Sequence, residues 1–250
     1  GALTVAQIGG LTTEHLASWA TSQIAALTYT ALGTLSGNQL KALSQDQISA
    51  PTRTALPGLA VTLIKGLTTT QVAGIPSSLI GALTTEQVAQ LTTAQIAVLS
   101  APQVGGLESS DIGALTTTQI KVLSPDQMAG LTTTNLPGLN VTHLTTTQIG
   151  GLADQTIGAL TTAQVSSLSL TQVIALRAGQ MGGLESSDIA ALSNDQVSKL
   201  STAQIAGLTT SNLPGLTAGQ INTLTTTQVA ALESDDLTTM TSIQVNTLTT

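Results

Sequence analysis

The sequence contains no cysteine and very few aromatic residues. Phe is absent, and Trp19 and Tyr29 are the only other large aromatic side chains in 250 residues. Without cysteine there are no disulfides and no thiolate metal sites, which is compatible with a protein exported without oxidative folding. A conventional core takes much of its buried area from aromatic rings, so this interior must be built from Leu, Ile, Val and Met.

Charge is also scarce, at 8% of residues against roughly 25% in an ordinary domain. The formal net charge is −7. The six basic residues are scattered: Lys41, Arg53, Lys65, Lys121, Arg177 and Lys199. No basic stripe exists to bind phosphates or an anionic membrane surface, and no apolar run approaches the ~18 residues of a membrane span. We therefore expect no nucleic-acid partner and no membrane insertion.

What the sequence has instead is a repeat of eight residues. Apolar positions alternate at spacings of five and three, as in the run Leu83, Val88, Leu91, Ile96, Leu99. The pattern extends from Leu3 to Leu248 with one short unit at 139–143, after which it restarts at Leu144. No linker interrupts it, so we predict a single continuous array over residues 1–250. Both ends lie inside the pattern, so we also expect a piece of a longer protein.

A longer repeat overlies the octads. Gly105–Ile112 returns as Gly182–Ile189, and Leu-Pro-Gly-Leu occurs at 56–59, 136–139 and 213–216. The first two copies of this tetrapeptide are ten octads apart, and the next two are ten octads apart less the residues missing from the short unit. Duplication of a block of ten octads explains both spacings.

Each octad reads Leu-Thr/Ser-Thr-x-Gln-Ile/Val-x-Gly/Ala, which predicts about one turn of helix. Thr or Ser followed three residues later by Gln is a capping box, as in Thr84 with Gln87 and Thr92 with Gln95. Pro125 follows Ser124 and suits the first helical position. A Gly near the unit's end can take the left-handed conformation, and the next Leu then completes a Schellman-type stop.

One turn of helix is unstable alone, so stacking of units must stabilise it, as in other solenoids. We predict an all-α repeat solenoid with one eight-residue unit per helix. The alternative is a β-solenoid, because Thr, Ile and Val favour strands. Against it, a spacing of five places Leu and Ile on opposite faces of a straight strand.

Few residues suggest chemistry. His15 and His143 are each interpreted as a polar cap at the position where most units have Gln. Neither has a Cys or a second His at ligand spacing. No Ser-His-Asp set and no nucleophile elbow appears. We therefore predict that the protein is not an enzyme and expect no catalytic residue and no cofactor.

Acidic residues recur in a pattern three residues apart and raise the question of calcium. The candidates are Glu108, Asp111, Glu185, Asp188, Glu233, Asp235 and Asp236. Calcium takes six to eight oxygen ligands, so one unit supplies too few unless neighbouring coils contribute. The competing interpretation is a variant cap, because acids are favoured near a helix N-terminus. We favour the cap.

The motif Leu-Thr-Thr-x-Gln-Ile/Val-x-x-Leu, as in Leu91–Leu99 and Leu224–Leu232, resembles low-complexity arrays of large bacterial secreted or surface proteins described as adhesin-like. The resemblance covers nearly the whole chain and implies an extracellular or cell-surface location. It further implies a structural or adhesive module: an extended rod, a spacer or a fibre-forming segment. We expect the partners to be further repeats, through end-to-end self-association or within the parent protein. The alternative is a binding module that presents a regular Thr/Gln face to polysaccharide or ice.

Overall fold

The computed structural model describes residues 4–248, and within them the chain forms helices and no β-strand. Most octads contain one short helix, so the all-α repeat solenoid is confirmed and the β-solenoid alternative is wrong. The chain divides into two compact units, Gly1–Gly130 and Leu131–Thr250.

The first unit consists of helices four to six residues long, together with one 3₁₀ helix. They are α1 (Val5–Gly9), α2 (Thr13–Ala17), α3 (Thr21–Ala25), α4 (Tyr29–Leu32), α5 (Gly37–Ala42), α6 (Gln45–Ile48), η1 (Leu56–Gly58), α7 (Val61–Ile64), α8 (Thr69–Gly74), α9 (Ser77–Ile80), α10 (Thr85–Ala89), α11 (Thr93–Ala97), α12 (Ala101–Gly105), α13 (Ser109–Ala114), α14 (Thr117–Lys121) and α15 (Pro125–Ala129).

The second unit has the same construction with more 3₁₀ helices. Its elements are η2 (Leu136–Gly138), η3 (Val141–His143), α16 (Thr146–Gly151), η4 (Ile157–Ala159), α17 (Thr162–Ser166), α18 (Leu170–Ile174), α19 (Ala178–Gly183), α20 (Ser186–Ala191), α21 (Asn194–Ser198), α22 (Thr202–Ala206), η5 (Leu213–Gly215), α23 (Ala218–Ile221), α24 (Thr226–Val229), α25 (Ser234–Thr239) and α26 (Ser242–Leu248).

The start of most α-helices follows from the predicted capping box, although α7 and α9 begin without one. Thr92 has an extended backbone, and its hydroxyl accepts from the Gln95 backbone N–H at 3.2 Å. The Gln95 side-chain oxygen in turn accepts from the Thr92 backbone N–H at 2.7 Å. Pro125 occupies the first position of α15, as predicted. Local sequence therefore decides where the helices begin.

The end of each helix differs from the prediction. No described residue has a positive φ, so the expected left-handed glycine stop is wrong. Gly106, after α12, keeps right-handed angles with φ −82° and ψ −12°. The helix stops instead at the next Leu, which is extended, as at Leu115 with φ −66° and ψ 132°. This Leu still donates its backbone N–H to the Ile carbonyl three residues earlier, which satisfies one carbonyl of the last turn.

Some of the glycines serve close packing instead. A Cβ at Gly106 would lie 2.8 Å from Ile80 Cγ2 and would clash with the Ser77 carbonyl oxygen on the neighbouring coil. A Cβ at Gly207 would meet the Ala178 carbonyl in the second unit in the same way. Only glycine lets the two backbones approach this closely.

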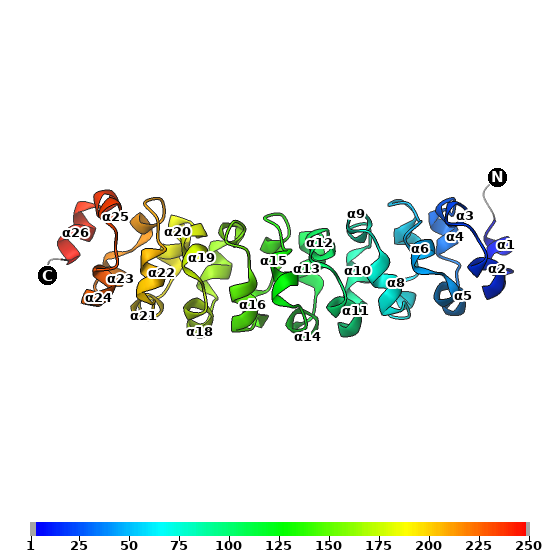
Figure 1. Cartoon of the computed structure of the whole chain (residues 1–250), viewed down its shortest axis with the longest axis horizontal. Helices are drawn as coiled ribbons and strands as arrows, with labels where there is room; N and C mark the ends of the chain where they lie inside the picture. Colours follow the sequence, from blue (N-terminus) through cyan, green and yellow to red (C-terminus); the bar gives the residue numbers. More distant parts are fainter. Residues whose placement is uncertain (1–3, 249–250) are drawn as a thin grey trace. The chain divides into compact units, whose positions relative to one another are not determined.

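Units stack so that each helix packs against the third one after it in the chain. Figure 1 shows α9 beside α12 and α11 beside α14 in the first unit, and both pairs are in contact. In the second unit α17 packs against α20, and α19 against α22. Side-chain bonds also reach back to the fourth octad, as from Gln95 to Ile64. One coil of the solenoid therefore contains between three and four octads.

The core is a column formed by the two apolar positions of each octad. Leu91 is 3% exposed and Ile96 is fully buried, and the same positions are buried throughout the interior coils. Burying each such side chain contributes roughly 1.5–3 kcal/mol. The short unit at 139–143 keeps this register, because Val141 and Leu144 are both buried.

Candidate functional site

In most interior octads, one glutamine side chain performs two tasks. Gln95 accepts from the Thr92 backbone N–H through Oε1, which completes the cap of α11. Its Nε2 donates to the carbonyl oxygens of Ile64 at 2.9 Å and Leu67 at 2.7 Å. These carbonyls end a helix of the previous coil. We call this arrangement the glutamine clamp.

The clamp recurs along both units with a constant offset. In most cases Nε2 donates to carbonyls 28 and 31 residues earlier, the first of these at 2.6–2.9 Å. Gln87, Gln119, Gln196 and Gln244 make the bond to the carbonyl 28 residues earlier and not the one at 31, and we count them as clamps too. The residues that make both bonds are Gln39, Gln47, Gln71, Gln95, Gln103, Gln127, Gln172, Gln180, Gln204, Gln220 and Gln228. Both offsets lie between three and four octads, in agreement with the number of octads in one coil.

A one-turn helix needs such a clamp more than a long helix does. Four N–H groups and four C=O groups at the ends of any helix lack intrahelical partners, and in one turn these ends make up the whole helix. The Gln95 side chain is 1% exposed, so water cannot satisfy the groups around it. A buried carbonyl left without a donor costs about 1–3 kcal/mol. One amide therefore satisfies the start of one helix and the end of another.

Asparagine performs the same task in the unit of the 3₁₀ helix η5. Asn212 precedes η5 in a Leu-Pro-Gly-Leu unit and is 1% exposed. Its side-chain oxygen accepts from the Thr209 backbone N–H at 2.8 Å, and its Nδ2 donates to Met181 and Leu184 at 2.8 and 2.9 Å. The shorter amide thus spans the same two ends in this variant unit.

The acidic residues considered for calcium form variant caps. Asp111 is 2% exposed and occupies the glutamine position of α13. One carboxylate oxygen accepts from the Glu108 backbone N–H at 3.0 Å, and the other from the Thr85 hydroxyl at 2.9 Å. A carboxylate cannot donate, so this unit has the cap without the clamp.

The other acidic units repeat this geometry. Asp188 accepts from the Glu185 backbone N–H at 3.1 Å and from the Thr162 hydroxyl at 3.0 Å. Asp236 accepts from the Glu233 backbone N–H at 3.1 Å, while Asp235 lies beside it in the first turn of α25. Within residues 4–248, no three acidic or histidine side chains lie close enough together to hold a metal ion.

The two histidines differ from each other. His15 is a cap as predicted, because its Nδ1 accepts from the Thr12 backbone N–H at 3.3 Å. For His143 the cap interpretation is wrong. Gln172 clamps onto Val141 and Leu144 at the usual offsets, so Val141 occupies the Ile position and His143 follows two residues later. There its Nδ1 is buried without a hydrogen-bond partner.

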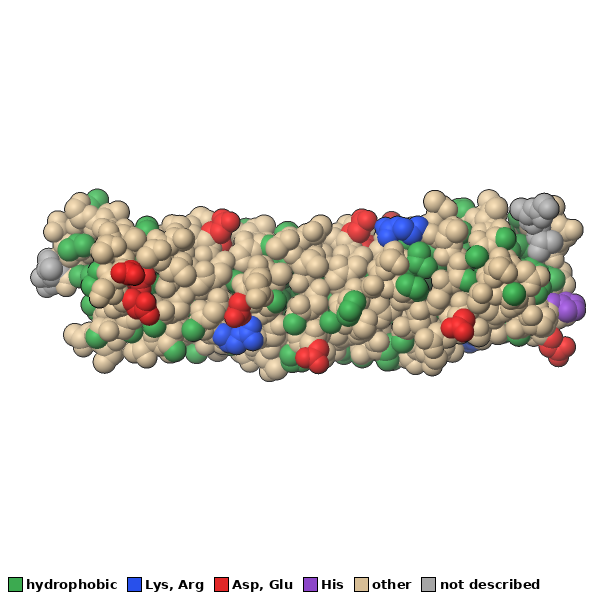
Figure 2. Space-filling model, turned by 45° about the horizontal axis from the view of Figure 1, so that its top comes forward, with side chains coloured by type: hydrophobic (Ala, Val, Ile, Leu, Met, Phe, Trp, Pro, Cys, Tyr) green, Lys and Arg blue, Asp and Glu red, His purple; other side chains and the backbone are tan. Residues whose placement is uncertain are grey.

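The outer surface carries hydroxyls and little charge. Figure 2 shows only scattered acidic and basic side chains on the face in view. Threonine hydroxyls pair at some helix starts, as at Thr116 with Thr118, 3.0 Å apart. Most interior glutamine side chains are buried, so the described surface presents Thr and Ser far more regularly than Gln. Arg177 and Asp154 form an ion pair between coils at 2.6 Å, with both side chains about half exposed.

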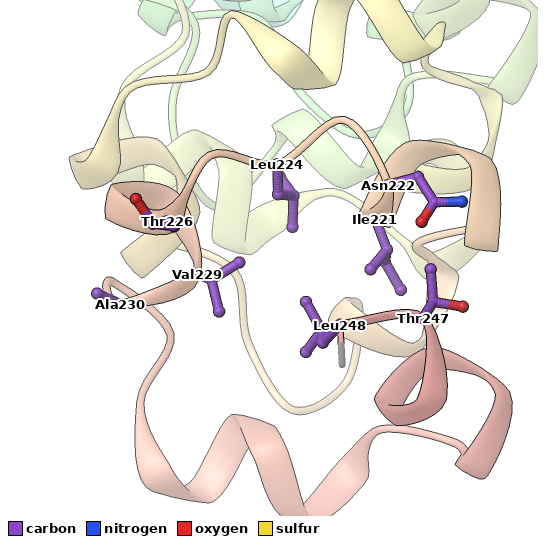
Figure 3. A pocket seen from close by; sticks show the side chains of 8 residues that line it. All are labelled: Ile221, Asn222, Leu224, Thr226, Val229, Ala230, Thr247 and Leu248. Carbon is purple, nitrogen blue, oxygen red and sulfur yellow. The ribbon is translucent and has the colours of Figure 1, made fainter. Parts of the chain in front are cut away.

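A pocket lies in the second unit between the coil of α23 and α24 and the helix α26. Ile221, Leu224, Val229 and Leu248 converge on it (Figure 3). Leu224 and Val229 are only half-buried, although residues at the same octad positions in interior coils are buried. The pocket is therefore a part of the core column that the described residues cover only in part.

The comparisons identify a repeat. A family model described as ALTTAQ repeat matches residues 104–141 and again residues 181–218. The two matches begin at the same interval as the last two Leu-Pro-Gly-Leu copies, and they support a tandem-repeat protein. No curated protein matches the chain. Among the described residues, no helix has the length and apolar character needed to span a membrane.

Proposed function

We propose that this chain is a non-enzymatic structural repeat module of an extracellular or cell-surface protein, acting as an extended rod, spacer or fibre-forming segment. The glutamine clamp carries this proposal. The residues that repeat most regularly serve the array itself. Leu and Ile pack in the core, Thr caps its own helix, and Gln bonds one coil to the next. Such a repeat lengthens without changing its local structure, which suits a spacer.

The proposal predicts how length depends on octad number. Small-angle X-ray scattering of the whole chain, and of a variant with residues 88–111 deleted, measures both the maximum dimension and the cross-section. The deletion removes three octads in register. We expect a shorter particle with an unchanged cross-section and an unchanged helical circular dichroism signal per residue. A compact particle of equal length would contradict the rod.

Self-association is part of the proposal, and the clamp supplies its chemistry. Gln7 and Gln23 on the first coil are exposed, and each uses Oε1 to cap its own helix. No bond from either Nε2 is present within residues 4–248. At the pocket, Leu224 and Val229 are half-buried, so a further coil of the same repeat can pack against them. Joining these surfaces, in a second copy or in neighbouring repeats, gives a head-to-tail contact.

Sedimentation velocity over a hundredfold concentration range tests this association. We expect the wild type to form larger species as concentration rises, and Gln7→Glu with Gln23→Glu to weaken this at least tenfold. Gln90→Glu places the same charge on an exposed residue outside any clamp and serves as the control. A wild type that stays monomeric throughout overturns self-association and leaves the spacer role standing.

The surface location rests on the resemblance of the Leu-Thr-Thr-x-Gln motif to adhesin-like arrays. An antibody against this chain, applied to intact source cells before and after external protease treatment, tests it. We expect labelling of intact cells that protease removes. Labelling only after permeabilisation would overturn the location.

A second candidate function is a module that binds polysaccharide or ice through threonine. Recurring hydroxyl pairs support it, such as Thr52 with Thr54 at 3.0 Å and Thr225 with Thr227 at 2.9 Å. A glycan array and a thermal-hysteresis assay decide between the two functions. Binding that is lost in Thr225→Val with Thr227→Val would favour this second candidate over the spacer.

A further inference from the structure

Two consecutive octads of the first unit lack a clamp. The glutamine position is occupied by Ala55 in the η1 unit and by Leu63 in the α7 unit, and neither side chain can donate. The flanking clamps are Gln47, which bonds Leu16 and Trp19, and Gln71, which bonds Leu40 and Leu43. Successive clamps are therefore three octads apart here.

Elsewhere the described clamps within each unit follow one another at intervals of one or two octads. Single units are skipped, as at Leu79 and Asp111 in the first unit and at Asp188 in the second, and clamps resume in the next octad. The gap at Ala55 and Leu63 is thus the widest in the described clamp series, because it leaves two adjacent octads unclamped.

Within the described part of the first unit, no other hydrogen bond fills this gap. By the offsets of 28 and 31, the clamps would have reached the carbonyls of Ile24, Leu27, Leu32 and Leu35. Among the described residues of the first unit, no hydrogen bond joins residues 20–36 to residues 50–66. The polar bonds from Ser49 to Gly74 and from Arg53 to Ser78 run to the following coil and do not join these two segments.

Packing alone holds these two coils together. α4 lies against η1, and a Cβ at Gly58 would clash with the Tyr29 backbone, so the contact is close. Ala31, Leu32 and Leu56 are buried in it. The cost of separating the coils is therefore the loss of apolar burial, without the two charge-neutral hydrogen bonds per octad that a clamp adds.

We propose that the chain has a built-in seam between residues 20–36 and residues 50–66, where neighbouring coils separate and close reversibly while clamped coils stay shut. Opening lets water reach the carbonyls of Leu27 and Leu35, which have no donor among the described residues when the seam is closed. In a clamped coil the same motion breaks the hydrogen bonds between the glutamine amide and the carbonyls, so opening costs more. The seam allows the array to bend at one defined place. This bending does not depend on the proposed cell-surface location.

Hydrogen exchange of the whole chain followed by mass spectrometry locates the seam. Peptides from residues 20–36 and 50–66 are compared with residues 88–107 of the same unit, where Gln95 and Gln103 are clamped. We expect exchange from the seam to be at least about tenfold faster. Equal protection in both regions overturns the proposal.

Ala55→Asn is the rescue variant. Asn212 shows that an asparagine in a Leu-Pro-Gly-Leu unit reaches both carbonyls. We expect Ala55→Asn to slow exchange in residues 20–36 about fivefold to tenfold and to leave residues 88–107 unchanged. Ala55→Leu has a similar size without an amide and is the matched control. Equal slowing by Leu would assign the effect to packing and overturn the clamp account.

Gln71→Glu keeps the test open if Ala55→Asn fails to fold. The carboxylate still accepts from the Thr68 backbone N–H but cannot donate to Leu40 and Leu43. We expect the fast-exchanging region to extend into residues 38–45. Unchanged exchange there would show that clamps do not govern opening.

Discussion

The Nε2 atom of Gln127 lies 2.6 Å from the carbonyl oxygen of Leu99, a residue 28 positions earlier in the chain. The types of these residues do not indicate the contact, because one is a polar cap residue and the other is a core leucine. Their bond joins the start of α15 to the turn that follows α11, and its equivalents hold the coils of both units in register.

Replacing a clamp glutamine by glutamate isolates the donor half of its role. In Gln95→Glu the cap acceptor stays, but a carboxylate faces the carbonyls of Ile64 and Leu67. We expect the free energy of unfolding to fall by about 2–4 kcal/mol, measured by denaturant titration. Gln7→Glu makes the same change on an exposed cap and should stay within about 0.5 kcal/mol. Equal losses would mean that the clamp contributes nothing.

Removing the cap hydroxyl tests the start of the helix. Thr92→Val keeps the shape of the side chain but removes the acceptor of the Gln95 N–H. We expect a loss of about 1 kcal/mol in the free energy of unfolding. Thr93→Val changes the adjacent, exposed residue in the same way and should be nearly neutral. A Thr93 variant as damaging as the Thr92 variant would refute the assignment.

Replacing glycine by alanine should lower the stability at one position and raise it at another. Gly106→Ala pushes a methyl group against the Ser77 carbonyl and Ile80, and we expect a loss of about 1–3 kcal/mol. Gly9→Ala has open space around the new Cβ, and the better helix former should stabilise by up to about 1 kcal/mol. Thermal melts of both variants provide the comparison, and a gain in Gly106→Ala would contradict close coil packing.

The acidic units should tolerate conversion to the consensus. Asp111→Gln supplies the missing amide for the carbonyls of Ile80 and Leu83, which stand at the usual clamp offsets from this position. We expect a gain of about 1–2 kcal/mol, seen as a higher melting temperature. Asp126→Gln removes a charge from an exposed first-turn position and should be neutral or slightly destabilising. A lower melting temperature for Asp111→Gln would indicate that the buried carboxylate has a role of its own.

Much of the fold could be predicted because its signals are local. Thr and Gln three residues apart define a helix start by themselves, and the spacing of Leu and Ile identifies the buried positions. The predicted mechanism of the helix end is wrong. Gly106 does not adopt a left-handed conformation; its missing side chain lets the Ser77 carbonyl approach. A constraint from a neighbouring coil leaves no sign in the octad that carries it. For the same reason the sequence assigns His143 to the wrong octad position. Only the bond from Gln172 to Val141 shows which positions of the octad are missing from the short unit.

The sequence by itself determined the octad, its cap and its two core positions, because each depends on residues within a few places of one another. The tertiary structure decided how many octads form a coil, and hence which carbonyls lie 28 and 31 residues from each glutamine. That number depends on how the backbones pack across coils. Because of this packing, a glutamine that caps its own helix also bonds the previous coil. The acidic units and the units of Ala55 and Leu63 interrupt the series of clamps. Some of the glycines allow the backbones of neighbouring coils to approach closely.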